Sequence, residues 1–330
     1  MVKQINILII EDDEAHVELI RRSFDHHWID FTVTVKGNLA SAQAFLEVNT
    51  PDLVLCDWLL PDGKGIELIS LPDIDRRRFP IVVMTSHGNE ELAVEAMKAG
   101  ALDYIVKSPE AFAQMPDFIM RALREWEHIV AREQAEMSLK QVLLQTVESL
   151  ALMVEKRDPY TSGHQKKVSQ LASAIGREMK LSEDTLQGIY IAGILHDIGK
   201  ISIPAEYLSK PGRLDPIEFT IIKTHPGIAY DMLKAIDFPY PIAQIVLQHH
   251  EKCDGSGYPN ALKCRDLLLE ARIIAVADVV DAISSHRPYR PSLGIGSALE
   301  EISSHAGTLY DKEVVGACLA MFSRQGMHFD

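Results

Sequence analysis

The segment I-L-H-D-I-G-K, from Ile194 to Lys200, decides the fold of the larger part of this chain. It places an adjacent histidine and aspartate, His196 and Asp197, at the end of an apolar stretch with helical periodicity. An imidazole beside a carboxylate can bind two neighbouring metal ions, with the aspartate bridging them, when other segments supply more nitrogen and oxygen ligands. We therefore expect a fold that gathers such ligands around this pair.

The length and composition indicate a globular protein with more than one domain. The 330 residues are enough for two domains that each bury a core, and 47% of them are hydrophobic. The longest apolar runs, such as Ile5 to Ile10 and Ile273 to Ala277, are far shorter than the roughly 20 residues that a membrane span needs. The start of the chain does not resemble a signal peptide, so we expect a cytoplasmic protein without membrane insertion.

The charge and the cysteines exclude some classes of function. The formal net charge is -14, and residues 1 to 128 hold 12 basic against 22 acidic residues. This excess argues against DNA binding, which needs a basic surface to displace counterions. The four cysteines show no C-x-x-C spacing, so reduced thiols, mostly in the core, are expected. They are Cys56, Cys253, Cys264 and Cys318.

Residues 1 to 128 alternate strand-like and helical segments. Two continuous apolar runs, Ile5 to Ile10 and Leu53 to Cys56, read as buried parallel strands, and acidic residues follow each of them. The other predicted strands are Phe31 to Val35, Pro80 to Met84 and Tyr104 to Val106, and the helices are Ala15 to Phe24, Leu39 to Glu47 and Glu90 to Ala99. The pattern predicts an α/β, doubly wound, parallel sheet of five strands, with its site at the carboxyl ends of the strands.

Polar residues follow several of these strands. Asp12, Asp13 and Asp57 would form an oxygen-only site suited to magnesium. Thr85 and Lys107 would offer a hydroxyl and a positive charge to phosphoryl oxygens. Such a set suits phosphoryl transfer onto a carboxylate.

These residues, with D-W-L-L-P-D-G-K-G (57 to 65) and Y-I-V-K (104 to 107), resemble the receiver domain of response regulators, which has a flavodoxin-like fold. The resemblance implies a cognate histidine kinase as partner. It implies Asp57 as the phosphoacceptor, Asp12 and Asp13 as magnesium ligands, Thr85 and Tyr104 as the switch pair, and Lys107 as the phosphate contact. One feature departs from the pattern: Ser108 stands where receivers commonly have proline, and Pro109 follows it.

Residues 117 to 156 predict one long connecting helix, because no proline or glycine interrupts them. Apolar residues recur at three- and four-residue spacing, broken only by two charged positions. The series is Ile119, Leu123, Trp126, Val130, Glu133, Met137, Lys140, Leu144, Val147, Ala151 and Val154. The helix could form a parallel coiled coil in a homodimer and carry a signal. Alternatively its second half, from about Leu143, is the first core helix of the next domain. Both can hold.

Residues 140 to 330 have helical periodicity nearly throughout and predict an all-α domain. Two adjacent polar pairs, His196-Asp197 and His249-His250, lie at the ends of apolar helices, where burial requires partners for each group. Asp278 lies inside an apolar helix, where a cation is the expected partner. The predicted helices are 163 to 179, 183 to 197, 216 to 223, 226 to 236, 242 to 250, 268 to 285, 296 to 305 and 312 to 322.

Five ordered segments carry a second resemblance. They are H-D-I-G-K (196 to 200), T-H-P (224 to 226), H-H-E-K-C-D-G-S-G-Y-P (249 to 259), A-V-A-D-V-V-D-A-I (275 to 283) and R-P-Y-R (287 to 290). Together they resemble the HD-GYP phosphodiesterases, HD-superfamily enzymes that hydrolyse cyclic di-GMP. The resemblance implies His164, His196, Asp197, His225, His249, His250 and Asp278 as metal ligands, with Asp197 bridging. It implies substrate contacts from Lys200, from Gly257, Tyr258 and Pro259, and from Arg287 or Arg290.

The chemistry implied by this resemblance is hydrolysis by a water that two divalent metal ions activate, with His196, Asp197 and Lys200 at its centre. The expected product is the linear dinucleotide pGpG, and further cleavage to GMP stays open. Some family members bind a third metal through a glutamate four residues before the first histidine, where this chain has Tyr160. Two metal ions are therefore expected, and the resemblance implies that they are iron or manganese.

The expected function is that of a two-component response regulator in which phosphorylation of Asp57 controls hydrolysis of cyclic di-GMP. Two alternatives stay open. The second domain could be a cyclic-dinucleotide sensor or adaptor without turnover, or a phosphodiesterase for another cyclic dinucleotide, such as a mixed GMP-AMP ring.

Overall fold

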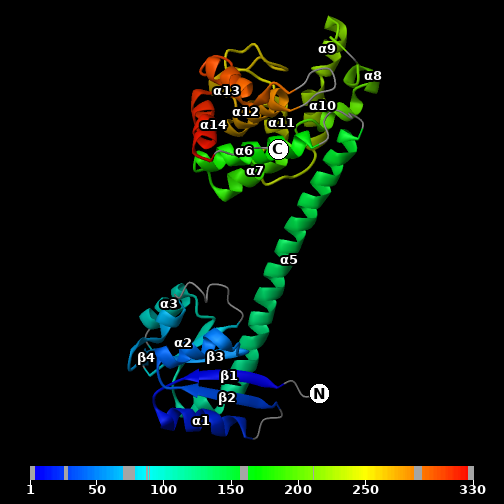
Figure 1. Cartoon of the computed structure of the whole chain (residues 1–330). Coiled ribbons are helices and arrows are strands. Elements are labelled where there is room, and N and C mark those ends of the chain that lie inside the picture. Colours follow the sequence, from blue (N-terminus) through cyan, green and yellow to red (C-terminus); the bar gives the residue numbers. More distant parts are fainter. Residues whose placement is uncertain are drawn as a thin grey trace. The chain divides into compact units, whose positions relative to one another are not determined.

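The computed structural model describes residues 4–25, 29–69, 79–86, 88, 90–156, 163–210, 212–285 and 292–325 (Figure 1). The chain forms two compact units, Met1–Ser138 and Leu139–Asp330. The first is α/β and the second is all-α, as predicted. Within the described residues, no helix combines the length and the apolar character that crossing a bilayer requires.

The first unit is built on a five-stranded parallel sheet, which confirms the predicted doubly wound fold. Its strands, in spatial order, are β2 (Phe31–Lys36), β1 (Ile5–Ile10), β3 (Leu53–Asp57), β6 (Ile81–Thr85) and β7 (Asp103–Val106). The order reverses direction between β1 and β3, where doubly wound sheets bind their ligands. The carboxyl ends of these two strands therefore lie side by side.

Helices cover both faces of this sheet because successive strand residues point to opposite sides. Ile7 and Ile9 of β1 pack in one core, and Leu8 and Ile10 pack in the other. The helices are α1 (Glu14–Phe24), α2 (Leu39–Val48), α3 (Glu90–Ala99), the short α4 (Pro109–Ala113) and the start of α5 (Met115–Glu155). A small antiparallel pair, β4 (Leu59–Leu60) and β5 (Gly63–Lys64), and the 3-10 turn η1 (Gly65–Leu68) complete the unit.

The departure at Ser108 has a local explanation, which is helix α4. The Ser108 hydroxyl accepts a hydrogen bond from the Ala111 amide at 3.1 Å, and Pro109 occupies the first turn. Serine at the cap followed by proline is a common start of a helix. The residue after Lys107 therefore starts a short helix, which the sequence analysis did not predict.

Helix α5 is one continuous helix of 41 residues, as the segment 117 to 156 predicted (Figure 1). Near its start, Ile119 and Ala122 are buried in the core of the first unit. Near its end, Val147, Ala151 and Val154 are buried in the core of the second. Residues 131–143 between these parts are exposed. The second half of the predicted helix is therefore also a core helix of the second unit.

The second unit is a helical fold around one core. Its longer helices are α6 (His164–Glu178), α7 (Glu183–Leu195), α10 (His225–Leu233), α12 (Leu269–Ser284), α13 (Gly294–Ser304) and α14 (Lys312–Gln325). The shorter ones are α8 (Ala205–Leu208), α9 (Pro216–Ile222) and α11 (Ile242–Gln248), with 3-10 turns η3 (Ile198–Ser202) and η4 (Cys264–Asp266). The helix that was expected to reach Asp197 ends at Leu195, so the histidine-aspartate pair lies at its C-terminus.

Helices α6 and α7 approach each other closely because small residues lie at their crossing. A Cβ added at Gly193 would come within 2.8 Å of Ser169 Cα. The Ser169 hydroxyl also donates a hydrogen bond to the Tyr190 carbonyl at 2.9 Å. This crossing sets the position of the end of α7, where His196 and Asp197 follow.

The expectation of four reduced cysteines is wrong for two of them. Cys253 and Cys264 are joined by a disulfide bond, whereas Cys56 and Cys318 are buried free thiols. The bonded cysteines lie 11 residues apart at the two ends of one loop. Their pairing depends on how that loop folds back, which residue spacing alone did not indicate.

We expect Gly193→Ala to lower the free energy of unfolding of the helical unit by about 1–3 kcal/mol, because α6 and α7 must move apart. Gly316→Ala is the matched control. Gly316 is an exposed position of α14 with nothing within 4 Å of an added Cβ, and there the same change should stabilise by up to about 1 kcal/mol. Scanning calorimetry of the full chain measures both. Shifts of the same sign would contradict the close-approach explanation.

Candidate metal centre

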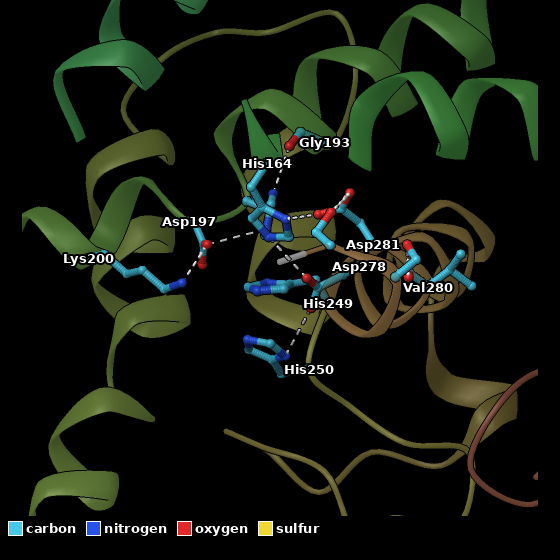
Figure 2. A network of polar contacts seen from close by, with 12 residues as sticks. His164, Gly193, Asp197, Lys200, His249, His250, Asp278, Val280 and Asp281 are labelled. Carbon is cyan, nitrogen blue, oxygen red and sulfur yellow. Dashed lines mark hydrogen bonds and ion pairs between the residues drawn. The ribbon is translucent and has the colours of Figure 1, made fainter. Parts of the chain in front are cut away.

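Two groups of histidines and aspartates meet in the core of the helical unit (Figure 2). One group is Asp197, His225, His249 and His250, and the other is His164, His196 and Asp278. Within each group the potential ligand atoms lie within 4.8 Å of one another. The structure therefore brings together all seven residues that the sequence analysis expected as metal ligands.

Three of the imidazoles are oriented by helix ends. Nδ1 of His196, His225 and His249 lies 2.7, 2.7 and 2.6 Å from the carbonyl oxygens of Gly193, Ile222 and Val246. These carbonyls belong to the last turns of α7, α9 and α11, where helical carbonyls lack a partner within the helix. A carbonyl only accepts, so Nδ1 carries the hydrogen and donates it. The lone pair of Nε2 is thereby left for the interior of the site.

His164 is oriented by a carboxylate instead of a carbonyl. Its Nδ1 donates to Asp281 Oδ2 at 2.6 Å, while its Nε2 faces Asp278 Oδ1 at 3.2 Å. The Ser285 hydroxyl donates to the other oxygen of Asp281 at 2.9 Å. Asp281 was not expected at the site. The three-residue spacing from Asp278 in D-V-V-D puts both carboxylates on one face of α12, and this was the signal available in the sequence.

The Asp197 carboxylate lies between the two groups. Its Oδ1 is 3.3 Å from His225 Nε2, and its Oδ2 is 3.4 Å from His196 Nε2 and 2.6 Å from Lys200 Nζ. Asp197 Oδ1 and His196 Nε2 are buried without a hydrogen-bond partner. Buried polar atoms in native proteins usually have one, so these two atoms fit a bound cation.

The protonation states of most of these groups fit cation binding, and His164 is the exception. Burial disfavours its charged form, but the hydrogen bonds that it donates to Asp278 and Asp281 outweigh burial and raise its pKa to about 9, so a metal must displace a proton from this ring. Burial lowers the pKa of His250 to about 3 and lowers that of His249 well below its usual value. Burial would raise the pKa of Asp197, but nearby Lys200 and His196 hold it well below the usual range. Neutral imidazoles and ionised carboxylates are the forms that bind metals.

Gly199 and the loop after His250 complete the site. A Cβ at Gly199 would overlap the backbone carbonyl of His225, so only glycine allows η3 to pack against the start of α10. The Tyr258 ring lies against His250, with ring centroids 4.8 Å apart. Gly257 packs directly on the backbone of Glu251, where a side chain would overlap it.

Glu251 is a second residue that the sequence analysis missed. It is buried, and its two carboxylate oxygens accept hydrogen bonds from the amides of Asn260 and Leu262 at 2.7 and 3.1 Å. The loop that carries Tyr258 and Pro259 is thus anchored beside the histidine pair. Arg287, Arg290 and Tyr160, which the sequence analysis also named, lie outside the described residues.

The first unit has a separate acidic cluster at the carboxyl ends of β1 and β3. It consists of Glu11, Asp12 and Asp57. Lys107 Nζ lies 2.7 Å from Glu11 Oε2 and 2.8 Å from Asp57 Oδ2. Thr85 is buried at the end of β6, and its carbonyl accepts the Lys107 amide at 2.8 Å. Tyr104 on β7 is 36% exposed.

Asp13, which was expected as a metal ligand, is not part of this cluster. Its carboxylate accepts the Ala15 amide at 2.8 Å and caps α1. Strand β1 ends at Ile10, so the next two residues, Glu11 and Asp12, lie at the sheet edge and the third begins the helix. In a run of three acids, the strand end decides which two face the site.

Known proteins match both units. Residues 7–116 match the response regulator receiver domain, and residues 148–314 match the HD domain. The cyclic di-GMP phosphodiesterase response regulator RpfG of Xanthomonas campestris is 34% identical over 96% of this chain and 87% of its own length. A cyclic di-GMP phosphodiesterase of Thermotoga maritima is 34% identical over 96% of this chain and 90% of its own length. The 3'3'-cGAMP-specific phosphodiesterase 3 of Vibrio cholerae is 29% identical over 77% of this chain and 57% of its own.

We expect Asp281→Asn to weaken the binding of Mn²⁺ by roughly 10- to 100-fold, because the amide no longer holds His164 as a carboxylate does. Isothermal titration of the metal-free full chain measures the affinity. Ser285→Ala is the control: it removes only one contact to Asp281 and should change the affinity by less than about threefold. Equal affinities for Asp281→Asn and the unmodified chain would contradict the orienting role.

Proposed function

We propose a function from the family: the chain belongs to the response regulators that join a receiver domain to an HD-GYP cyclic di-GMP phosphodiesterase domain. The proposed activity is hydrolysis of cyclic di-GMP at a site of two divalent metal ions, controlled by phosphorylation of Asp57. The position of the Asp197 carboxylate carries this proposal. One of its oxygens faces His225 and the other faces His196, so it can serve both ligand groups. A bridging carboxylate is what a pair of adjacent ions requires.

The residues divide between the two ions by their grouping. His225, His249 and His250 would hold one, His164, His196 and Asp278 would hold the other, and Asp197 would serve both. When bound, the ions supply Lewis acidity and lower the pKa of a water that attacks phosphorus. Nitrogen-rich sites of this kind accept several metals, and iron or manganese is proposed from the family resemblance.

The chain's own groups act on the substrate around these ions. Lys200 Nζ, partly exposed beside Asp197, would neutralise charge that develops on the phosphoryl oxygens. The backbone carbonyls and Asp281 hold the imidazoles, so the ligands need no rearrangement during the reaction. Gly257, Tyr258 and Pro259 would shape the entrance next to His250, and Arg287 or Arg290 would contact substrate. The proposed product is pGpG. Tyr160 stands where some family members have the glutamate that binds a third metal, so we propose less further cleavage to GMP.

The receiver would control this site through helix α5. The proposed event is phosphorylation of Asp57 by a histidine kinase, with magnesium held by Glu11, Asp12 and Asp57. Lys107 would contact the phosphoryl group, and Thr85 and Tyr104 would respond to it. A homodimer through α5 is proposed because apolar side chains of its middle part are exposed, with Met137 64% and Leu139 72% accessible.

Another cyclic dinucleotide is the second candidate substrate. Relatives that are named 3'3'-cGAMP-specific phosphodiesterases support it, and one of them is 34% identical over 46% of this chain. A sensor or adaptor without turnover is disfavoured, because such a protein would not need seven converging ligands and Lys200. Comparing turnover of the two cyclic dinucleotides by the same sample separates the enzyme candidates.

We expect His196→Ala and Asp197→Ala each to abolish metal loading and to reduce turnover of cyclic di-GMP by more than roughly 100-fold, because each removes a ligand. Anaerobically purified protein is assayed for metal content and for pGpG formation. His305→Ala is the matched control, since His305 also contacts a carbonyl of its own helix but lies outside both ligand groups. Full hydrolysis by either site variant would contradict the proposed mechanism.

We expect Asp57→Asn to leave basal hydrolysis intact but to block any change caused by a small-molecule phosphodonor. The amide keeps the size of the side chain and cannot accept the phosphoryl group. Asp12→Asn should behave similarly because it weakens magnesium binding, whereas Asp13→Asn should respond normally because asparagine also caps a helix. Rates with and without the donor test all three. A normal response by Asp57→Asn would break the proposed coupling.

A further inference from the structure

The disulfide bond closes the loop that approaches the metal centre. Cys253 and Cys264 lie at the two ends of residues 254–263, which contain Gly257, Tyr258 and Pro259. Backbone hydrogen bonds also join the two ends of the loop next to the disulfide bond. The Cys264 amide donates to the Cys253 carbonyl at 3.1 Å, and Asp254 pairs with Lys263 in an antiparallel bridge.

The closed loop is connected to a candidate metal ligand. The Tyr258 amide donates to the His250 carbonyl at 3.3 Å, and the Tyr258 ring lies against the His250 ring. The backbone amides of Asn260 and Leu262, which lie inside the loop, donate hydrogen bonds to the Glu251 carboxylate, which lies outside it. The loop is thus held at two places: at its two ends by the disulfide bond and the backbone pairing, and in its interior by the buried Glu251 carboxylate.

The chemical surroundings of the four cysteines differ. Cys56 and Cys318 are fully buried, and burial raises the pKa of Cys318 to about 12, which suppresses the reactive thiolate. Cys253 and Cys264 are partly accessible. Cys264 Sγ also lies 3.6 Å from Asp311 Oδ2, a carboxylate that Arg272 holds in place and that can accept a hydrogen bond from the thiol of the reduced form. Both the bonded and the open form of this pair therefore have suitable partners.

We infer that Cys253 and Cys264 are a reversible thiol–disulfide modification site that tightens the substrate loop when it is oxidised. The co-reactant is a low-molecular-weight disulfide of the glutathione class. One protein thiolate attacks this disulfide, releases one small thiol and forms a mixed disulfide; the second protein thiolate then displaces the other small thiol. The balance is one protein dithiol and one small disulfide converted to one protein disulfide and two small thiols.

The consequence for catalysis rests on the proposed function, whereas the exchange itself does not. When the bond opens, the Glu251 contacts and the backbone pairing still hold the loop, so the ligands of the metal centre keep their places. The loop around Tyr258 becomes more mobile, and ordering it on substrate binding then costs more. The change should therefore affect KM for cyclic di-GMP rather than kcat.

The exchange is tested on the full chain equilibrated at a series of ratios of reduced to oxidised glutathione. Alkylation and peptide mass spectrometry identify the free thiols at each ratio. We expect Cys253 and Cys264 to change together, while Cys56 and Cys318 stay reduced and protected throughout. A pair that stays fully bonded or fully open across the series would overturn the inference.

The effect on the site is tested with manganese-loaded protein in its oxidised and reduced forms. We expect KM for cyclic di-GMP to be about 3- to 10-fold lower in the oxidised form, with kcat changed less than about twofold. The double variant Cys253→Ser/Cys264→Ser, which can form neither the bond nor a mixed disulfide at this site, should match the reduced form at every glutathione ratio. Equal KM values in the two forms would overturn the inference. If the protein turns over no cyclic di-GMP, hydrogen exchange of residues 254–263 tests the inference instead. Equal protection of these amides in the two forms would contradict a disulfide bond that tightens the loop.

Discussion

The arrangement of the helical unit depends on one buried carboxylate, that of Asp197. An ionised carboxylate in a protein core is costly unless charged or hydrogen-bonding groups surround it. Here Lys200 lies 2.6 Å from one of its oxygens, and His196 and His225 face its two oxygens. The nearby Lys200 charge is the main reason that the pKa of Asp197 stays well below the usual range. One of its oxygens still lacks a hydrogen-bond partner. The helices therefore pack so as to surround a negative charge with groups that could serve as cation ligands.

The ligands are placed with precision because most of them lie at helix ends. His196 follows α7, His225 begins α10, and His249 follows α11. The unpaired carbonyls of helix C-termini orient three rings, so backbone geometry replaces a separate set of polar side chains. The positions of those helix ends depend in turn on close packing, as at Gly193 against Ser169 and at Gly199 against the start of α10. Packing and ligand geometry are thus coupled.

In the receiver, the ends of β-strands position the acidic residues, as helix ends position the histidines in the helical unit. Parallel strands β1 and β3 bring Glu11 and Asp57 side by side, and Lys107 lies between them at 2.7–2.8 Å. Helix α5 starts in this core and ends in the core of the helical unit, so each core fixes one end of the same helix. Its middle part, residues 131–143, is exposed and carries apolar side chains such as Met137 and Leu139.

The sequence by itself determined the elements and most of the site. Periodicity is a local property, so buried strands, amphipathic helices and the adjacent pairs His196-Asp197 and His249-His250 could be read along the chain. The end of β1 at Ile10 was predicted, but only the tertiary structure decided that Lys107 contacts Glu11 at this edge while Asp13 caps α1. It also decided that Asp281 supports His164 and that Cys253 bonds to Cys264. These outcomes depend on contacts between distant segments, and such contacts follow from packing, which no local pattern encodes.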